Sequence, residues 1–220
     1  MIKTKAVVFD AYGTLFDVNS AAKKCKDKIG AKWETFANFW RTTQLEYTWL
    51  RSLMKRHKNF WDITEDSLDK SMEVFNINKN MKNELLSLYK ILSPYPEVKE
   101  VLEDLKKKNF KLAILSNGTL DLLNELVESN KLNNLFDDLF SIEEVKIYKP
   151  DPRVYEIPIK KYKIKSDEIT FLSANTWDVS GGGNFGYNSI WVNRHNSVFD
   201  ILDFQPKNEI SNLTQLLDIV

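Results

Sequence analysis

Apolar residues along the chain follow two different periods, and the change from one to the other divides the chain. Near the start, Ala6-Val7-Val8-Phe9 is an uninterrupted apolar run, which predicts a strand covered on both faces. From about Val18 to Leu92, apolar residues recur at helical spacing with no convincing alternating pattern. We therefore expect a helical insertion soon after the first strand.

Two prolines, Pro94 and Pro96, end the helical region because neither residue can continue a helix. Beyond them helix and strand patterns alternate, which is typical of a parallel sheet with helices on both faces. We expect helices over Glu97–Lys108, after Thr119 and near Asp178–Phe185, and strands over Lys111–Leu115, Ile169–Leu172 and Ser189–Val192. The predicted fold class is α/β: a Rossmann-like, doubly wound parallel sheet core (residues 1–15 and 96–220) with an inserted α-helical cap (residues 16–95).

Polar residues follow three of the predicted strands. Asp10 follows the first, Ser116-Asn117-Gly118-Thr119 follows the second, and Ser173 to Asp178 follow the third. The carboxyl ends of parallel strands converge on one crevice, where a carboxylate is placed to act as a nucleophile. The hydroxyl, amide and backbone N–H groups of the second segment suit an anion. Lys149 precedes a proline-initiated helix that carries Tyr155.

Composition narrows the class of protein. The 220 residues include 31 basic and 31 acidic side chains, so no overall field favours nucleic acid or a membrane surface. The single Cys25 cannot form an internal disulfide, and neither a leading signal peptide nor a twenty-residue apolar stretch is evident. His57 and His195 are far apart and indicate neither a metal site nor a catalytic triad. We expect a cytoplasmic protein with neither nucleic-acid nor membrane partners.

The segment DAYGTLFD at residues 10–17 resembles the first motif of the haloacid dehalogenase superfamily, in which the leading Asp attacks the substrate covalently. The later polar segments resemble the other motifs in order, and the chain is most similar to the type II L-2-haloacid dehalogenases. The closest signatures are Phe39-Trp40-Arg41, the segment from Gln44 to Met54, Ser173-x-Asn175-x-Trp177-Asp178, Phe185-Gly186 and Trp191-x-Asn193-Arg194.

Two positions separate this chain from the phosphatases of the superfamily. Phosphatases carry a second Asp two residues after the nucleophile and a Gly-Asp pair in the last motif, whereas this chain has Tyr12 and Ala174-Asn175. A phenol with a pKa of about 10 is a poor magnesium ligand, and a halide leaving group needs no proton. The resemblance therefore implies carbon–halogen cleavage with no metal and no cofactor. A magnesium-dependent phosphatase and a non-catalytic binding protein on this scaffold remain as alternatives.

The resemblance also implies roles for residues that contact the substrate. Asp10 would attack C2 of an L-2-haloalkanoate with inversion, giving free halide and an aspartyl ester that water hydrolyses to a D-2-hydroxy acid. Lys149 would lie near Asp10 and the substrate carboxylate, which Ser116 would also bind. Arg41, with Asn117 beside it, would stabilise the departing halide.

A second set of polar residues would serve the hydrolytic step. Asp178 and Asn175 are candidates to position or activate the water. Ser173 and Thr14 would orient the carboxylates by hydrogen bonds. Tyr155 would donate to Lys149 or near Asp178. Ser173, Thr14 and Tyr155 each have a simpler alternative, because turn hydroxyls and packed tyrosines are common in proteins.

Four bulky side chains would form an apolar wall around the alkyl chain of the substrate: Tyr12, Leu45, Phe60 and Trp177. Such a wall would exclude water during the displacement and limit substrates to about two to four carbons. Ordinary core packing is the alternative for the last three. The family analogy further implies a homodimer.

Overall fold

The computed structural model describes residues 3–220, which form a six-stranded sheet in the order β3-β2-β1-β4-β5-β6. Each neighbouring pair within these residues is parallel. The central strand, β1, has no exposed side chain, as its apolar run predicts. The strands are β1 (Ala6–Phe9), β2 (Lys111–Ser116), β3 (Asp138–Ser141), β4 (Ile169–Ser173), β5 (Asn188–Val192) and β6 (Asn208–Ile210).

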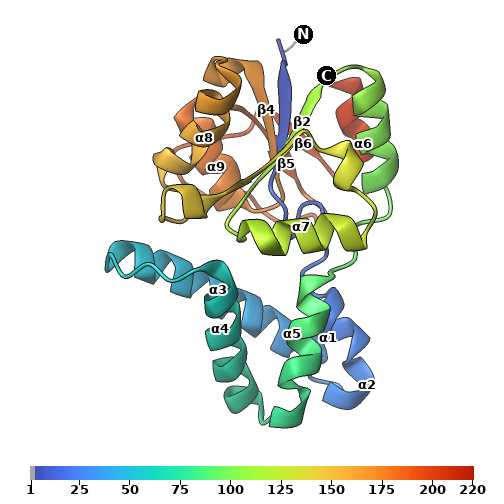
Figure 1. Cartoon of the computed structure of the whole chain (residues 1–220), viewed down its shortest axis with the longest axis vertical. Coiled ribbons are helices and arrows are strands. Elements are labelled where there is room, and N and C mark those ends of the chain that lie inside the picture. The colour runs from blue at the N-terminus through green and yellow to red at the C-terminus, as the bar shows by residue number, and fades with distance from the viewer. Residues whose placement is uncertain (1–2) are drawn as a thin grey trace.

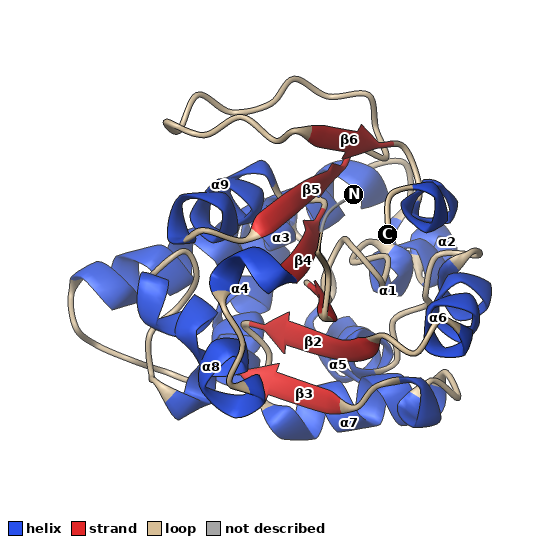
Figure 2. Ribbon diagram, turned by 90° about the horizontal axis from the view of Figure 1, so that it is seen from above, coloured by secondary structure: helices blue, strands red, loops and turns tan. Residues whose placement is uncertain are grey.

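Helices cover both faces of the sheet, so the α/β fold class is confirmed. Figures 1 and 2 place α8 and α9 on one side of the sheet and α6 on the other. In α6, the buried residues Val98, Val101, Leu102 and Leu105 recur at helical spacing and turn one apolar face inward. The helices in this part of the chain are α6 (Val98–Lys107), α7 (Leu120–Ser129), α8 (Pro152–Tyr162) and α9 (Thr176–Phe185).

Five α-helices lie between β1 and α6, and Figure 1 shows them grouped beyond the carboxyl ends of the strands. We call this group the cap helices. No helix among residues 3–220 is both long enough and apolar enough to cross a membrane. The cap helices are α1 (Ser20–Lys24), α2 (Lys26–Ile29), α3 (Trp33–Leu53), α4 (Phe60–Phe75) and α5 (Lys82–Lys90).

The chain crosses between sheet and cap helices twice, and the two crossings pair with each other. We call residues 15–17 the first linker and residues 93–95 the second. Phe16 and Pro94 form an antiparallel bridge. The Tyr95 N–H donates to the Leu15 carbonyl at 3.0 Å, and the Asp17 N–H donates to the Ser93 carbonyl at 2.9 Å. The cap helices are therefore joined to the sheet by a short two-stranded ribbon.

Two strands, β3 and β6, are not predicted from the sequence. Both lie at the edges of the sheet and have only four and three residues, respectively. Their residues include aspartate, asparagine and glutamate, which have low strand preference, so pairing with β2 and β5 organises them rather than their own composition. The helix expected near Asp178 begins two residues earlier, at Thr176.

Candidate active site

The order of strands reverses at β1, whose neighbours are β2 and β4. The carboxyl ends of these three strands therefore surround one crevice, the usual ligand site of such a sheet. Asp10 directly follows β1, Ser116 ends β2 and Ser173 ends β4. The fold thus brings together three residues that are distant along the chain.

A tight turn follows Asp10 and directs Thr14 back toward it. Gly13 has a φ of +91°, a backbone conformation that residues with a Cβ rarely adopt. The N–H groups of Leu15 and Phe16 both donate to the Ala11 carbonyl at 3.0 Å, which closes the turn. Thr14 is consequently buried within reach of the Asp10 carboxylate.

The Asp10 side chain is 7% exposed, and its carboxylate accepts hydrogen bonds from several directions. Its Oδ2 accepts from Thr14 Oγ1 at 3.0 Å and from Asn175 Nδ2 at 2.9 Å. Ser173 Oγ lies 3.5 Å from the same oxygen. Lys149 Nζ donates to Oδ1 at 3.2 Å. The carboxylate is therefore held in one orientation, with Oδ1 bonded only to Lys149 among residues 3–220.

Lys149 connects Asp10 to a second buried carboxylate. Its ammonium is fully buried and donates to Asp178 Oδ2 at 2.8 Å. Tyr155 Oη donates to Asp178 Oδ1 at 2.7 Å, so both Asp178 oxygens have a donor. Burial raises the pKa of the Asp178 carboxyl, and the nearby charge of Asp10 acts in the same direction, whereas Lys149 opposes both effects. Two buried carboxylates thus share one ammonium group.

The Lys149 backbone is fixed as firmly as its side chain. Its N–H donates to Asn117 Oδ1 at 3.2 Å, which ties it to the loop after β2. Its ammonium lies 5.1 Å from the Phe171 ring centroid, on β4. Asp151 caps α8 by accepting from the Arg153 N–H, so this helix begins just beyond the lysine.

Tyr155 belongs to a buried aromatic cluster behind Asp178. Its ring lies 5.9 Å from those of Phe171, Phe185 and Tyr187, measured between centroids. Burial raises the pKa of the Tyr155 phenol well above its ordinary value, with the Asp178 charge adding to the effect. The phenol is therefore a hydrogen-bond donor at neutral pH. Tyr155 has no exposed surface, and its contact with the site is the hydrogen bond that it donates to Asp178.

The loop after β2 packs tightly against Tyr12. Ser116 is buried, and its Oγ accepts from the Gly118 N–H at 3.1 Å. Ser141 Oγ donates to the Gly118 carbonyl at 2.6 Å. A Cβ at Gly118 would lie 3.0 Å from both Cε2 and Oη of Tyr12. The glycine therefore allows the loop to approach the tyrosine ring.

Tyr12 is part of an aromatic wall that extends into the cap helices. Its ring centroid lies 5.1 Å from that of Phe60 and 5.7 Å from that of Tyr89, on which it stacks. All three rings are buried. Burial raises the pKa of the Tyr12 phenol well above its ordinary value, so this group is uncharged at neutral pH. Tyr89 is not predicted as a site residue, because a tyrosine within a helical pattern carries no distinctive signal in the sequence.

A buried polar network in the cap helices orients Arg41. Its Nη1 donates to Gln44 Oε1 at 2.8 Å, and its Nη2 donates to the Tyr12 carbonyl at 3.4 Å. Gln44 Nε2 in turn donates to Thr64 Oγ1 at 2.6 Å and to Tyr89 Oη at 3.0 Å. Arg41 is thereby held against the turn that follows Asp10. Gln44 lies in one of the family signatures, but the sequence does not predict that Gln44 and Thr64 support Arg41.

One face of α3 is directed toward the sheet. Arg41, Leu45 and Trp49 are four residues apart, so they share this face, and Leu45 is half-buried. The Trp49 ring meets the Trp177 ring edge to face at a centroid distance of 5.4 Å. Trp177 therefore joins the start of α9 to the cap helices.

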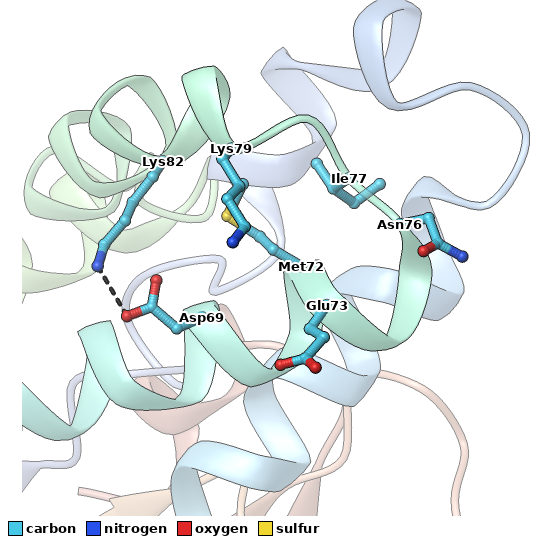
Figure 3. Close-up of a pocket in the computed structure, with 7 residues that line it drawn as sticks. All are labelled: Asp69, Met72, Glu73, Asn76, Ile77, Lys79 and Lys82. Atoms are coloured by element: carbon cyan, nitrogen blue, oxygen red, sulfur yellow. Dashed lines mark hydrogen bonds and ion pairs between the residues drawn. The ribbon is translucent and has the colours of Figure 1, made fainter.

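A cavity of about 450 Å³ lies away from these residues, at the end of α4 (Figure 3). Lys82 Nζ and Asp69 Oδ2 form an ion pair there, 2.8 Å apart. None of the side chains around Asp10 lines this cavity, so we assign it no part in the chemistry. Within the described residues 3–220, no group of three or more His, Cys, Asp or Glu side chains is placed to hold a metal ion.

Sequence similarity to known proteins extends over nearly the whole chain. The haloacid dehalogenase-like hydrolase family matches residues 4–186. The (S)-2-haloacid dehalogenase 4A of Burkholderia cepacia is 39% identical over 96% of this chain and 93% of its own length. The (S)-2-haloacid dehalogenase 1 of Pseudomonas sp. (strain CBS-3) is 40% identical over 96% of this chain and 94% of its own.

Solved structures agree with the sequence relatives. A dehalogenase with an intermediate complex superposes with a TM-score of 0.98 at 36% identity, covering 100% of this chain and 98% of that one. The L-2-haloacid dehalogenase of Xanthobacter autotrophicus with chloropropionic acid covalently bound gives a TM-score of 0.91 at 30% identity, covering 98% of both chains. With the fold, the site and the relatives in agreement, the chain belongs to the haloacid dehalogenase-like hydrolases and, within them, to the (S)-2-haloacid dehalogenase family.

Proposed function

We propose that this enzyme hydrolyses the carbon–halogen bond of short (S)-2-haloalkanoates and releases D-2-hydroxy acids with inversion at C2. The single observation that carries the proposal is the buried Asp10 carboxylate, which is oriented by Thr14 and Asn175 and paired with Lys149. This arrangement presents an immobilised carboxylate oxygen at the ligand-binding edge of the sheet.

In the first step an Asp10 oxygen attacks C2 of the substrate from the side opposite the halogen. Oδ1 accepts one hydrogen bond, whereas Oδ2 is contacted by several donors, so we assign Oδ1 as the attacking atom. A C–O bond forms as the carbon–halogen bond breaks, and the halide leaves with the bonding electron pair. The product of this step is an ester between Asp10 and the former substrate.

Groups around the attacking oxygen stabilise the displacement. Arg41 supplies positive charge beside the turn after Asp10, where we place the departing halide. Ser116 and the N–H groups of its loop bind the substrate carboxylate. Tyr12 and Phe60 exclude water from the alkyl chain, and Leu45 and Trp177 extend this apolar wall.

In the second step water attacks the carboxyl carbon of Asp10, breaks the ester and regenerates the carboxylate. Asn175 and Ser173 donate toward Oδ2, where negative charge develops during this attack. Asp178 accepts the proton of the water, since its raised pKa brings it closer to the range useful for a general base. Asp178 passes this proton to the alkoxide of the product, which leaves as the hydroxy acid, and the second proton of the water is released to solvent as the Asp10 carboxyl group ionises.

Catalysis in this scheme needs no metal ion. The Lys149 ammonium lies between the two buried carboxylates and supplies the positive charge there. Tyr12 and Asn175 replace the two carboxylates expected in a magnesium-dependent phosphatase, and the Asn175 amide donates to Asp10. These side chains favour dehalogenation over phosphate-ester hydrolysis.

The proposal also covers the domain division of the chain, its cellular compartment and its oligomeric state. We assign residues 16–95 as the cap and residues 1–15 and 96–220 as the catalytic core. The single buried thiol of Cys25 suits the reducing cytoplasm. Exposed apolar side chains at the end of α3, namely Leu50, Leu53 and Met54, support a homodimer.

Halide release from the two enantiomers of 2-chloropropionate tests the function. We expect the purified enzyme to release chloride from the (S) form alone, at a rate that EDTA does not change. Equal release from both enantiomers would contradict the inversion scheme. If neither substrate reacts while a phosphate ester is hydrolysed in the presence of magnesium, the phosphatase alternative is the correct one.

Tyr155→Phe is expected to lower both stability and turnover. The change leaves the buried Oδ1 of Asp178 without its donor, which costs about 1–3 kcal/mol of the free energy of unfolding. We expect kcat to fall about tenfold because Asp178 loses the contact that fixes it. Urea unfolding and steady-state halide release measure the two effects.

Tyr187→Phe is the matched control for Tyr155→Phe. The Tyr187 hydroxyl donates to the Tyr155 carbonyl within the same buried cluster, without contacting a catalytic group. We expect this variant to lose stability while kcat stays within about twofold of the wild-type value. Equal losses of kcat in both variants would show that the effect comes from the packing of the cluster.

A further inference from the structure

Arg194 follows β5 and lies where the sheet meets both linkers. Its side chain is 7% exposed. Nη1 donates to Glu97 Oε1 at 2.7 Å, and Nη2 donates to the Thr14 carbonyl at 2.8 Å. The guanidinium carbon lies 3.7 Å from the centroid of the Tyr95 ring. A carboxylate, a carbonyl and an aromatic face together fix the planar group in one orientation.

The contacts of Arg194 reach both crossings between core and cap. Thr14 immediately precedes the first linker, and Tyr95 is the last residue of the second. Glu97 lies two residues further, at the start of α6. Since the linkers also pair with each other, Arg194 joins the base of the whole ribbon to the end of β5.

Thr14 extends this connection to the nucleophile. Its hydroxyl donates to Asp10 Oδ2 at 3.0 Å and accepts from the Ala174 N–H at 2.8 Å. Its carbonyl accepts from Arg194. The hydroxyl that orients Asp10 is therefore carried on a peptide that Arg194 holds in place. A small displacement of that peptide would misdirect the attacking carboxylate.

We propose that Arg194 is a positioning residue for the dehalogenation reaction: it fixes the base of the cap linkers and, through Thr14, the orientation of the Asp10 carboxylate. The proposal rests on the proposed function for its kinetic test. It assigns Arg194 no contact with substrate or halide, which distinguishes it from Arg41.

The competing explanation is an ordinary buried ion pair between Arg194 and Glu97. Burial alone would raise the pKa of the Glu97 carboxyl, but hydrogen bonds from its own backbone N–H and from Arg194 outweigh burial and lower it. Glu97 is therefore charged at neutral pH. If the ion pair were the whole role of Arg194, loss of either partner would have the same effect on the enzyme.

Two single variants separate the explanations. Arg194→Lys retains a positive charge for Glu97 but loses the planar fork that also reaches Thr14. Glu97→Gln removes the charge of the pair and leaves Arg194 free to hold Thr14. We expect Arg194→Lys to lower kcat for (S)-2-chloropropionate about 10- to 100-fold, with KM within about threefold of wild type. Glu97→Gln should keep kcat within about twofold of the wild-type value, even if its urea midpoint falls as much as that of Arg194→Lys.

A double variant and hydrogen exchange add two independent measurements. In a Thr14→Ala background, Arg194→Lys should lower kcat much less than it does in the wild type, because both changes interrupt one connection. Amide exchange of the peptide containing residues 14–17 should become at least about tenfold faster in Arg194→Lys than in Glu97→Gln.

The possible results distinguish failure of the positioning role of Arg194 from failure of the proposed function. Wild-type kcat in a folded Arg194→Lys enzyme, or equal kcat losses in Arg194→Lys and Glu97→Gln, would overturn the positioning role. If the wild-type protein releases no halide, the proposed function fails, and the exchange measurement then decides the role of Arg194. Unchanged exchange at residues 14–17 would overturn that role as well.

Discussion

Asp10→Asn is expected to lower kcat for halide release by more than about 10,000-fold. The amide has nearly the shape of the carboxylate but carries no charge, and it is a poor nucleophile toward C2 of the substrate. Thr14 and Asn175 donate to Asp10 Oδ2 and would still find an amide oxygen there. The variant should therefore fold, and chloride release from (S)-2-chloropropionate measures the loss.

Asp69→Asn is the matched control for this substitution. Asp69 pairs with Lys82 at the cavity beside the end of α4 (Figure 3). None of the side chains that contact Asp10 lines that cavity. The kcat of Asp69→Asn should stay within about twofold of wild type, because loss of one exposed ion pair changes little. The intact mass of Asp10→Asn checks that the amide has not hydrolysed back to aspartate. Substantial turnover by the intact amide variant would exclude Asp10 as the nucleophile.

Lys149→Met is expected to reduce stability and activity together. Its loss leaves Asp10 and Asp178 buried without their shared cation, which costs about 3–5 kcal/mol of the free energy of unfolding. We expect kcat to fall by at least about 100-fold, because one buried donor to the nucleophile is removed. Lys82→Met, which breaks an exposed pair, should cost at most about 1 kcal/mol.

The stability cost of Lys149→Met should depend on pH in a defined direction. Burial already raises the pKa of Asp178 in the folded protein, and removal of Lys149 removes the opposing effect. A carboxyl whose folded pKa exceeds its unfolded pKa binds more protons when folded, so stability falls as pH rises between the two values. The deficit of Lys149→Met relative to wild type should thus be smaller at pH 4 than at neutral pH.

Urea unfolding across this pH range measures the dependence. A deficit that stays constant from acid to neutral pH would mean that the charge of Asp178 does not depend on Lys149. Conversely, a variant that is stable at every pH but inactive would assign Lys149 to catalysis without a structural role.

The parts of the fold that follow from sequence are those with a strong local signal. The apolar run before Asp10 predicts a central strand, and a parallel sheet necessarily brings the ends of its strands together. These two facts place Asp10, Ser116 and Ser173 at one edge before any coordinates are known. The short strand β3 lacks such a signal, because its pairing with β2 and not its composition creates it.

Local sequence patterns do not identify the residues that orient the side chains of the site. Gln44 contacts Arg41 within α3, and Gln44 is itself held by Tyr89 of α5. Arg194 reaches Thr14 across 180 positions of the chain. Their residue types are common on helices and after strands, so their supporting role becomes evident only from the fold. Tyr155 was correctly associated with Asp178, yet its complete burial became evident only in three dimensions.

The central claim is that Asp10 becomes covalently attached to the substrate and that water then attacks its carboxyl carbon. A single turnover in water enriched in heavy oxygen, with enzyme in excess over (S)-2-chloropropionate, tests it directly. If Asp10 is the nucleophile, the heavy oxygen enters the carboxylate of the peptide containing Asp10, while the hydroxy acid keeps ordinary oxygen. Heavy oxygen in the hydroxy acid, with an unlabelled Asp10 peptide, would show direct attack of water on C2 and exclude the covalent intermediate.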